Sequence, residues 1–354
     1  MRLGMRVPTV VQFSAPRSVE LVEEPAAVLA PGQVRVRTLY SGISAGTELT
    51  AYRGSNPYLS KHWDAERRLF VDGTPSFGYP VAGWGYQEVG AVTETSVPDL
   101  QVGQRVWGIW GHRSEAVVDA AKLEGHVLPE SVPPMAGVFA RLGAIALNAV
   151  LDADIHLGED VAVFGQGVLG LITTRLATLN GARVIAVDAL PQRLGLAAKQ
   201  GAVLALNAVD DAVAERITTH TDGRGADTCI EISGSVRALH EAIRSVGVAG
   251  RVVASGFYQG DAIGLRLGEE FHHNRVRLVA SQIGGVNPGL AQRWSVERLQ
   301  RTFMDLVAAG TLDPLPLVSH VMGAREVARA FAEIDERPAD TLQVVLDFAD
   351  VDGS

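Results

Sequence analysis

The 354-residue chain contains almost no cysteine, and this scarcity limits its chemistry. Its single cysteine, Cys229, can form neither an internal disulfide nor a zinc site made of several thiolates. Cys229 lies in the middle of the expected strand DTCIEISG, where we expect a buried side chain rather than a nucleophile. The sequence therefore excludes a disulfide-stabilised scaffold.

Two further absences exclude whole classes of protein. No run of 18 or more apolar residues is present, so the sequence predicts no membrane span. The segment MRLGMRVPTVVQFSAP is basic but lacks the apolar stretch and the small-residue cleavage site of a signal peptide. The net charge of −9 argues against a nucleic-acid partner, because a phosphate backbone requires a basic surface. We expect a cytoplasmic enzyme with a small-molecule substrate.

The residues that are present form two different patterns in one globular chain. Hydrophobic residues make up 47% and charged residues 20%, which is ordinary globular composition. In the first part, alternating β-branched segments such as QVRVRTLYSG are separated by Gly, Pro and Asp. Short apolar strands then alternate with helices, which predicts a doubly wound parallel sheet. The sequence predicts an α/β protein with a β-rich domain (1–140), a nucleotide-binding domain (141–285) and a return to the first domain (286–354).

A glycine-rich motif opens the second region. Gly165-Gln166-Gly167-Val168-Leu169-Gly170 fits G-x-G-x-x-G, and it lies between an apolar strand and a helix, as in a Rossmann fold. We expect Gly165 to allow the tight turn, Gly167 to let the backbone approach a pyrophosphate, and Gly170 to let the helix pack on the strand. The helix N-terminus adds free N–H groups and a partial positive charge for the phosphates.

Asp188, at the end of the next apolar segment, indicates which dinucleotide binds. Its carboxylate would accept hydrogen bonds from the adenosine ribose and repel a 2′-phosphate, so NAD is expected over NADP. Arg193 lies close enough in sequence to offset part of this repulsion. Loops at the carboxyl ends of later strands should add further cofactor contacts. We expect Ser233 and Gly234 near the adenosine half of the cofactor and Gly256 and Phe257 near the nicotinamide half. Ser281 and Ile283 should add further contacts.

The whole arrangement resembles the medium-chain dehydrogenase/reductase superfamily of the zinc alcohol dehydrogenase type. The resemblance covers nearly the whole chain, through PGQVRVRTLYSGIS, GYQEVGAV, GQRVWG, the glycine-rich unit and the closing PLVSHVM and AREVARAF. It implies a GroES-like catalytic domain beside the Rossmann domain, and a homodimer joined through the edge strand NRVRLVASQIGG. SGISAGTEL with GYPVAGWGYQEVG is most similar to the bacteriochlorophyllide a dehydrogenase branch, whose members oxidise a hydroxyethyl side chain to acetyl.

The same resemblance indicates that the family's catalytic zinc ligands are replaced. The three ligand positions fall on Ser44, on Tyr86 and near Ala140, whose side chains are poor zinc ligands. The four-cysteine structural zinc lobe is missing as well. His272 and His273 would point opposite ways on a strand, so we expect them in a polar loop and not as ligands. The sequence therefore predicts no metal.

Without zinc, hydrogen-bond donors of the protein must polarise the substrate oxygen and exchange its proton. The catalytic candidates are Ser44, Thr47, Tyr86 and His112. By the resemblance, Thr47 matches the family's proton-relaying hydroxyl and Tyr86 replaces a ligand, while His112 would exchange protons with solvent. Structural roles stay open for all four: Tyr86 would fill the volume of a lost metal and Thr47 would cap a turn. Glu48 matches a family acid that is expected to hold a buried arginine.

Two tryptophans are expected near the substrate. Trp110 aligns with a pocket aromatic of the family, and Trp84 lies close to the segment 51–70. That segment would either form one wall of a roomy pocket or pack as a surface helix.

Together these residues predict a zinc-independent, NAD-dependent oxidoreductase. It would transfer hydride between nicotinamide and a secondary alcohol or ketone of a small or polycyclic metabolite. One alternative is an NAD(P)H-dependent reductase of activated C=C bonds, of the quinone or enoyl reductase type; Asp188 counts against it because those enzymes usually favour NADPH. Another is a non-catalytic NAD-binding sensor, which the glycine-rich loop fits equally well.

Overall fold

The computed structural model describes residues 7–352 and divides into two compact units. Residues 1–141 and 307–354 form the first unit, and residues 142–306 form the second. Residues 1–6, which begin the segment compared with a signal peptide, lie outside the described residues.

The sequence predicts that the second domain ends at residue 285, whereas the second unit of the structure ends at residue 306. The reason is the helix α8 (Val296–Ala308), most of which belongs to the second unit. Its Phe303 ring occupies the space beside Gly143, where an added Cβ would lie 2.0 Å from the ring. Phe303 is fully buried, so this helix is part of the second unit's core rather than of the returning segment.

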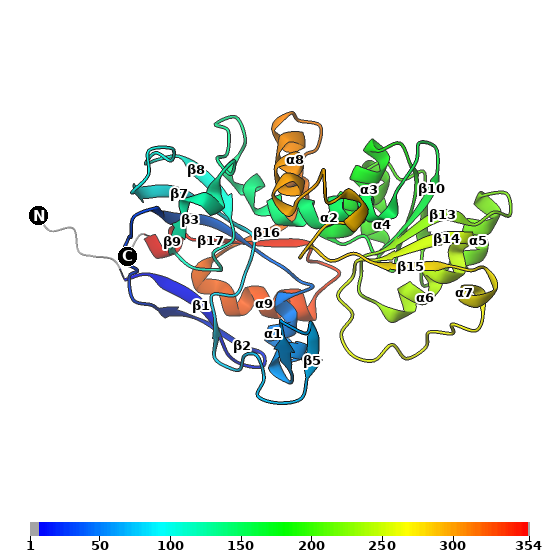
Figure 1. The fold of residues 1–354 in the computed structure, drawn as a ribbon, viewed down its shortest axis with the longest axis horizontal. Helices are drawn as coiled ribbons and strands as arrows, with labels where there is room; N and C mark the ends of the chain where they lie inside the picture. The colour runs from blue at the N-terminus through cyan, green and yellow to red at the C-terminus, as the bar shows by residue number, and fades with distance from the viewer. Residues whose placement is uncertain (1–6, 353–354) are drawn as a thin grey trace, which may run out of the picture. The chain divides into compact units, whose positions relative to one another are not determined.

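The first unit is built mainly of β-structure, shown in blue, cyan and red in Figure 1. Its strands are β1 (Thr9–Ala15), β2 (Ser18–Glu23), β3 (Gln33–Ile43), β4 (His62–Asp64), β5 (Leu69–Val71), β6 (Val81–Ala82), β7 (Glu88–Thr95), β8 (Arg105–Gly108), β9 (Glu115–Asp119), β16 (Val318–Gly323) and β17 (Gln343–Asp347). The largest sheet has the order β16-β17-β3-β7-β8, with β9 also paired to β3. A smaller sheet has the order β2-β1-β6, and β4 pairs with β5.

Short helices connect these strands. They are α1 (Glu48–Arg53), α9 (Val327–Glu336) and α10 (Ala349–Asp352), with the 3-10 helices η1 (Pro57–Leu59), η2 (Ala120–Leu123), η3 (Pro134–Phe139), η5 (Leu315–Leu317) and η6 (Ala324–Glu326).

Strand β3 shows how the sequence pattern produces this sheet. Val34 and Val36 are fully buried, whereas Arg35 and Arg37, which alternate with them along the strand, keep exposed surface. This alternation is the pattern of a strand with one face on a core. The strand ends at Ile43, so the loop that carries Ser44 and Thr47 leaves directly from the sheet.

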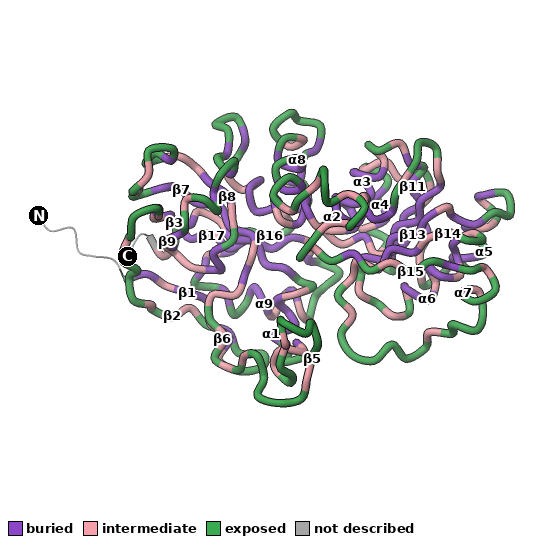
Figure 2. The backbone as a smooth tube through the Cα atoms, viewed as in Figure 1, coloured by how far each residue is buried: buried purple, intermediate pink, exposed green. Residues whose placement is uncertain are grey.

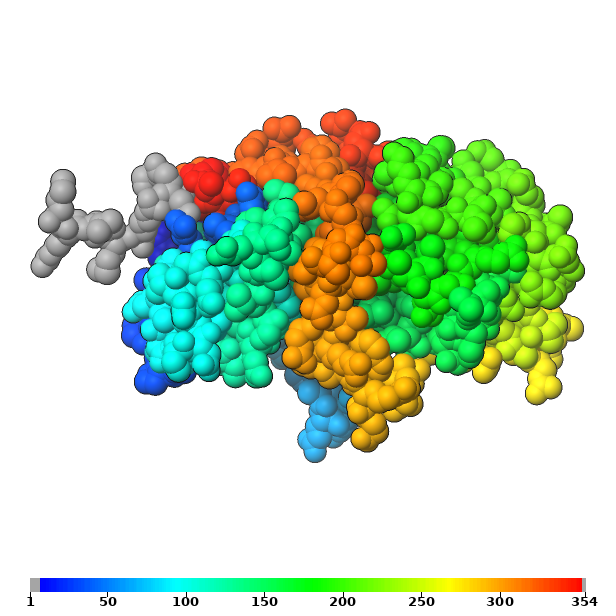
Figure 3. Space-filling model, turned by 90° about the horizontal axis from the view of Figure 1, so that it is seen from above, coloured from blue at the N-terminus to red at the C-terminus, as the bar shows by residue number. Residues whose placement is uncertain are grey.

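The C-terminal segment returns to the first unit, as the sequence predicts. Strand β17 pairs antiparallel with β3, with Val344 opposite Ile43 and Leu346 opposite Ser41. On α9, Phe331 packs edge-on against Phe13 with ring centroids 5.1 Å apart. In Figure 3 the red C-terminal segment lies against blue N-terminal residues. One hydrophobic core therefore joins the two ends of the chain.

The second unit contains the predicted parallel sheet. Its strands are β10 (Asp160–Phe164), β11 (Arg183–Asp188), β12 (Leu204–Asn207), β13 (Ala226–Glu231), β14 (Val246–Ala254) and β15 (Arg277–Ala280). They have the order β12-β11-β10-β13-β14-β15, which is that of a doubly wound Rossmann sheet. The unit's other elements are α3 (Val168–Leu179), α4 (Pro191–Lys199), α5 (Val213–His220), α6 (Val236–Ser245), α7 (Glu270–His273) and η4 (Pro288–Leu290).

Burial explains why these strands read as continuous apolar runs. Every residue of β10 is buried, and β11 and β13 are drawn almost entirely as buried in Figure 2. A parallel strand covered on both faces has no solvent side on which polar residues could alternate. Cys229 lies fully buried in β13, as expected, and burial raises the pKa of its thiol.

The long Ala/Leu helix of the sequence appears as η3 followed by α2 (Ala140–Ala153). By length and composition alone, Pro134–Ala153 could cross a membrane, but 67% of its most apolar window is buried inside the protein. It is a helix of the protein's core.

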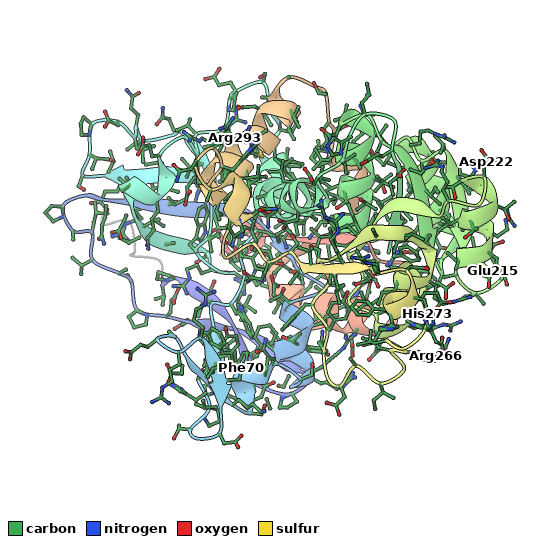
Figure 4. The ribbon with its side chains drawn as sticks, turned by 45° about the vertical axis from the view of Figure 1, so that its right-hand side comes forward. Phe70, Glu215, Asp222, Arg266, His273 and Arg293 are labelled. Atoms are coloured by element: carbon green, nitrogen blue, oxygen red, sulfur yellow. The ribbon has the colours of Figure 1, made fainter. Side chains whose placement is uncertain are left out.

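The structure excludes one of the two alternatives left open for the segment 51–70 and corrects the expectation that His272 and His273 lie in a loop. The segment 51–70 is not a surface helix: it holds the end of α1, the turn η1 and the β4–β5 hairpin. On that hairpin Phe70, labelled in Figure 4, contacts Tyr58 and Trp63, with ring centroids 5.3 and 4.9 Å apart. His272 and His273 close the short helix α7 rather than lie in a loop, because Glu270–His273 forms one helical turn.

Candidate active site

Three hydroxyl side chains meet in the first unit just after β3. Ser44 Oγ and Tyr86 Oη are hydrogen-bonded to each other, and the Thr47 side chain also bonds to the Tyr86 hydroxyl. Ser44 is buried, whereas Thr47 and Tyr86 each keep part of their surface exposed. The structure thus brings together three of the four residues that the sequence selects as catalytic.

The loop conformation explains how these side chains are placed. The backbone N–H of Glu48 donates to the Ser44 carbonyl, which starts α1 immediately after the loop. Thr47 occupies the N-cap position of α1, but its side chain makes no capping hydrogen bond. Its hydroxyl instead bonds to Tyr86, so a capping role does not account for the threonine side chain.

The surroundings keep the Tyr86 hydroxyl protonated. Burial raises the pKa of Tyr86, and the nearby Glu48 carboxylate raises it further, while the bonds from Ser44 and Thr47 lower it in part. The net shift is upward from an ordinary value of 10.0, so Tyr86 is a hydrogen-bond donor at neutral pH.

A fully buried network lies behind this loop. His112 places Nε2 2.7 Å from Glu48 Oε2 and Nδ1 2.5 Å from Ser41 Oγ. Ser41 Oγ is also 3.2 Å from Glu88 Oε1. None of these four residues is exposed to solvent. Gly85 makes room for the ring, since an added Cβ would lie 3.0 Å from both His112 and Glu88.

The charges in this network favour an extra proton. Burial lowers the pKa of His112, but Glu48 and Glu88 outweigh that effect and the net shift is upward. Burial also raises the pKa of Glu48 and of Glu88, which His112 lowers only in part. The network therefore keeps a proton at a pH where an isolated histidine would have lost it.

Two expectations about this network need correction. His112 is 0% exposed and has partners at both ring nitrogens, so it does not exchange protons directly with solvent. Glu48 pairs with this imidazole and not with an arginine. Glu48 begins α1, and His112, from the segment between β8 and β9, lies against it.

The two tryptophans chosen as pocket residues are held by packing. Trp110 is buried in a core cluster, and its indole N–H donates to Thr38 Oγ1 at 2.9 Å. It also lines a cavity of about 350 Å³, with Arg113 and Glu24 among its neighbours, but none of the four catalytic candidates lines that cavity. Trp84 is half-buried and meets Phe77 edge-on, with ring centroids 5.1 Å apart.

In the second unit, the glycine-rich loop has the geometry that its motif requires. Gly165 has a φ of +93°, in the left-handed region that favours glycine. A Cβ on Gly170 would lie 1.7 Å from the Gly165 carbonyl oxygen, so only glycine lets α3 approach the strand this closely. A Cβ on Gly167 would meet only the Arg193 guanidinium, at 3.9 Å, which leaves this part of the loop open to a ligand.

Asp188 is tied to this loop. Its Oδ2 accepts from the Gln166 backbone N–H at 2.6 Å, and its Oδ1 accepts from Leu190 N–H at 2.8 Å. Each carboxylate oxygen has a second lone pair for a ribose hydroxyl. The Gln166 side chain is fully buried, where it donates to the Val163 carbonyl and accepts from Thr174, so only its backbone can face a ligand.

The remaining cofactor candidates lie at the carboxyl ends of neighbouring strands or in the first turn of α3. Ser281 is buried and accepts from Asn148 Nδ2 at 3.3 Å, whereas Phe257 is 42% exposed. Val168 and Leu169 begin α3 and are half-buried. Ser233 and Gly234 follow β13, Gly256 and Phe257 follow β14, and Ser281 and Ile283 follow β15.

Sequence reasoning missed four residues of these sites. Ser41 and Glu88 complete the buried network, and Glu231 and Tyr258 connect two loops of the second unit. Glu231 had a signal, since it is an acid flanked by the apolar residues Ile230 and Ile232 at the end of an expected buried strand. Among residues 7–352, no group of three or more His, Cys, Asp or Glu side chains is arranged to hold a metal ion.

Comparisons with known proteins agree with this architecture. The family model for zinc-binding dehydrogenases matches residues 168–298. The D-guloside 3-dehydrogenase of Escherichia coli (strain K12) is 30% identical over 347 residues, covering 95% of this chain and 98% of the relative. The NADP-dependent isopropanol dehydrogenase of Thermoanaerobacter brockii is 30% identical over 248 residues, covering 68% of this chain and 66% of that protein.

The fold is shared with solved structures. The 2R,3R-butanediol dehydrogenase of Bacillus subtilis superposes with a TM-score of 0.78 at 20% identity, covering 96% of this chain and 99% of that one. Because D-guloside 3-dehydrogenase is 30% identical over 95% of this chain, the chain belongs to the medium-chain zinc-binding dehydrogenase family and is an NAD(P)-dependent oxidoreductase of the alcohol dehydrogenase class.

Proposed function

We propose that this protein interconverts a secondary alcohol and its ketone, with NAD as cofactor and without zinc, at the Ser44–Tyr86 hydroxyl pair. The observation that carries the proposal is the hydrogen bond between these two side chains. By the family resemblance they occupy two positions where zinc ligands would stand. Two neutral hydroxyls that bond to each other can bind a substrate oxygen directly.

The side chains at this place do not fit zinc. Zinc is held by thiolate, imidazole or carboxylate groups, whereas Ser44 and Tyr86 offer hydroxyls and Ala140 offers only a methyl group. The nearby imidazole and carboxylate, His112 and Glu48, are bonded to each other.

The chain's own residues can supply the proton chemistry. In ketone reduction, Tyr86 would donate a hydrogen bond to the carbonyl oxygen and then its proton to the developing alkoxide, which is the stronger base. Ser44 and Thr47 would stabilise the phenolate through their hydroxyls. The buried Glu48 charge disfavours that phenolate, and the partly exposed Tyr86 hydroxyl would regain its proton from solvent water. The bound nicotinamide supplies or accepts the hydride.

The second unit has residues that fit NAD. The open face at Gly167 would take the pyrophosphate, and Asp188 would take the adenosine ribose and disfavour a 2′-phosphate. Arg193 beside Gly167 would add a positive charge for the phosphates. The edge strand β15, where Leu278 is 42% exposed, would pair with its twin in a homodimer. We expect this dimer to work in the cytoplasm.

The substrate class follows from two resemblances. Similarity to D-guloside 3-dehydrogenase over 95% of the chain supports a ring hydroxyl of a sugar derivative. The SGISAGTEL and GYPVAGWGYQEVG motifs, shared with the bacteriochlorophyllide a dehydrogenase branch, support a hydroxyethyl-bearing polycyclic compound as the second group to assay.

Steady-state turnover of the purified enzyme tests this proposal. Tyr86→Phe should lower kcat for ketone reduction by about 100-fold or more, the usual effect of removing an oxyanion donor. Ser44→Ala and Thr47→Val should each cost less, because neither removes the proton donor. Tyr79→Phe is the matched control, since it removes a hydroxyl of the same unit that bonds only to the Ala51 carbonyl in the described contacts.

Three results would contradict the proposal. These are full turnover by the Tyr86→Phe, Thr47→Val double variant, one zinc per chain in metal analysis of an active preparation, or turnover of activated C=C bonds without turnover of any alcohol or ketone.

A further inference from the structure

Glu231 ends β13 and lies at the centre of a set of hydrogen bonds that no motif predicts. Its Oε1 accepts from the Ser233 backbone N–H at 2.8 Å and from the Ser233 hydroxyl. Its Oε2 accepts from Gly234 N–H at 3.2 Å and from the Tyr258 hydroxyl at 2.5 Å. One carboxyl group therefore joins the loop after β13, residues 232–235, to the loop after β14, residues 255–258.

These two loops also approach each other closely. A Cβ on Gly256 would lie 2.2 Å from the Gly234 nitrogen, and a Cβ on Gly234 would lie 2.8 Å from the Phe257 carbonyl oxygen. The first loop in turn touches the glycine-rich loop, because a Cβ on Gly165 would lie 2.7 Å from Ser233 Cβ. Three loops at the carboxyl ends of β10, β13 and β14 are thus packed against one another.

The Glu231 carboxyl is buried without a basic side chain among its bonded partners. Burying a charge is unfavourable unless donors replace the lost water, and four donors surround this group. Burial raises the pKa of Glu231, while the bonds from Ser233 and Tyr258 lower it. Ordinary packing of two loops does not require a buried acid, so the acid has a more specific use.

The order of the strands indicates that use. Asp188 ends β11, the glycine-rich loop follows β10, and β13 and β14 are the next strands on the other side. If the adenosine ribose lies at β11 and the pyrophosphate at β10, the rest of an extended dinucleotide continues over β13 and β14. The loops joined by Glu231 are therefore those that would receive the nicotinamide riboside half.

We propose that Glu231 and Tyr258 form a clamp that holds loops 232–235 and 255–258 in the conformation that receives the nicotinamide riboside half of the cofactor. Both are positioning residues, and this role rests on the proposed function of the second unit as an NAD site. The clamp makes affinity for the complete dinucleotide depend on Tyr258, while the adenosine end is held independently by the glycine-rich loop and Asp188.

Binding of NADH and of ADP-ribose to the full chain tests the clamp. ADP-ribose carries the adenosine and pyrophosphate but no nicotinamide. Tyr258→Phe removes one of the four hydrogen bonds to the buried carboxyl, so we expect its Kd for NADH to rise about tenfold and its Kd for ADP-ribose to stay within about twofold. Glu231→Gln should raise the NADH Kd further. Its amide N–H₂ group would replace one of the two oxygens that accept hydrogen bonds, so the donors on that side would lose their acceptor.

Ser245→Ala is the matched control. It removes a buried hydroxyl that donates to the Glu241 carbonyl at 2.7 Å, next to the start of β14 and so at the opposite end of that strand. It should leave both dissociation constants unchanged. If Glu231→Gln does not fold, Tyr258→Phe alone still decides the question.

The outcomes separate the clamp from the proposed function. If Tyr258→Phe weakens the binding of NADH but not that of ADP-ribose, the clamp is supported. Equal weakening of NADH and ADP-ribose, or no change in either, overturns the clamp and leaves NAD binding intact. A wild-type chain that binds neither ligand overturns the proposed function and the clamp with it.

Discussion

The buried His112–Glu48 pair should make stability depend on pH in a direction that the structure fixes. His112→Gln removes the titrating ring and leaves a polar side chain of similar size. In the folded protein the pKa of His112 is raised above its ordinary 6.5, so the native state binds more protons than the unfolded chain above that pH. The stabilisation by this pair is therefore complete below about pH 6.5 and is lost as pH rises through the folded pKa. The raised pKa values of Glu48 and Glu88 act in the same direction at lower pH.

The size of the effect follows from the geometry. Opposite charges 2.7 Å apart attract by about 6 kcal/mol at an effective dielectric constant of about 20. Breaking a buried pair usually costs about 3–5 kcal/mol, because one partner is left buried and alone. The variant should thus be about 3 kcal/mol less stable near pH 6.5. One extra bound proton changes stability by at most about 1.4 kcal/mol per pH unit, so the deficit should shrink as the pH rises above 6.5 and His112 loses its proton.

Urea unfolding at about pH 6.5 and at about pH 8.5 measures the difference. His156→Gln is the control, since His156 is a solvent-exposed histidine whose removal should not change the slope. The reasoning is refuted if the free energy of unfolding of the wild type does not fall between the two pH values. Equal stability of the two proteins near pH 6.5 would refute the estimate for the pair itself.

Three further predictions concern single residues. Gly170→Ala places a methyl group 1.7 Å from the Gly165 carbonyl oxygen, so NADH affinity measured by fluorescence should fall by at least about tenfold; unchanged affinity would show that the loop gives way. Asp188→Asn removes the charge that disfavours a 2′-phosphate, so the ratio of NADPH to NADH affinity should rise about tenfold, and a constant ratio would exclude Asp188 as the selector. Cys229 is fully buried and burial raises its pKa, so a thiol reagent should modify it only in urea; rapid reaction of the folded protein would contradict its burial.

Local pattern in the sequence determined much of this protein. The alternation in β3, the continuous apolar run of β10 and the G-x-G-x-x-G spacing each reflect neighbours within a few residues. Such features predict a strand, a buried strand and a tight turn wherever they occur, because burial and φ values are local consequences of residue type. They predict the α/β class, the parallel sheet and the tight glycine turn after β10.

Only the tertiary structure decided which side chains act on one another. Ser44 meets Tyr86 across 42 residues, and Glu48 meets His112 across 64. Ser41 faces Glu88 because β3 and β7 pair in that register, and no local pattern encodes the register. Glu231 and Tyr258 meet because β13 and β14 lie side by side. The sequence selected hydroxyls and a histidine as candidates. The tertiary structure placed the hydroxyls together and enclosed the histidine between the Glu48 carboxylate and the Ser41 hydroxyl.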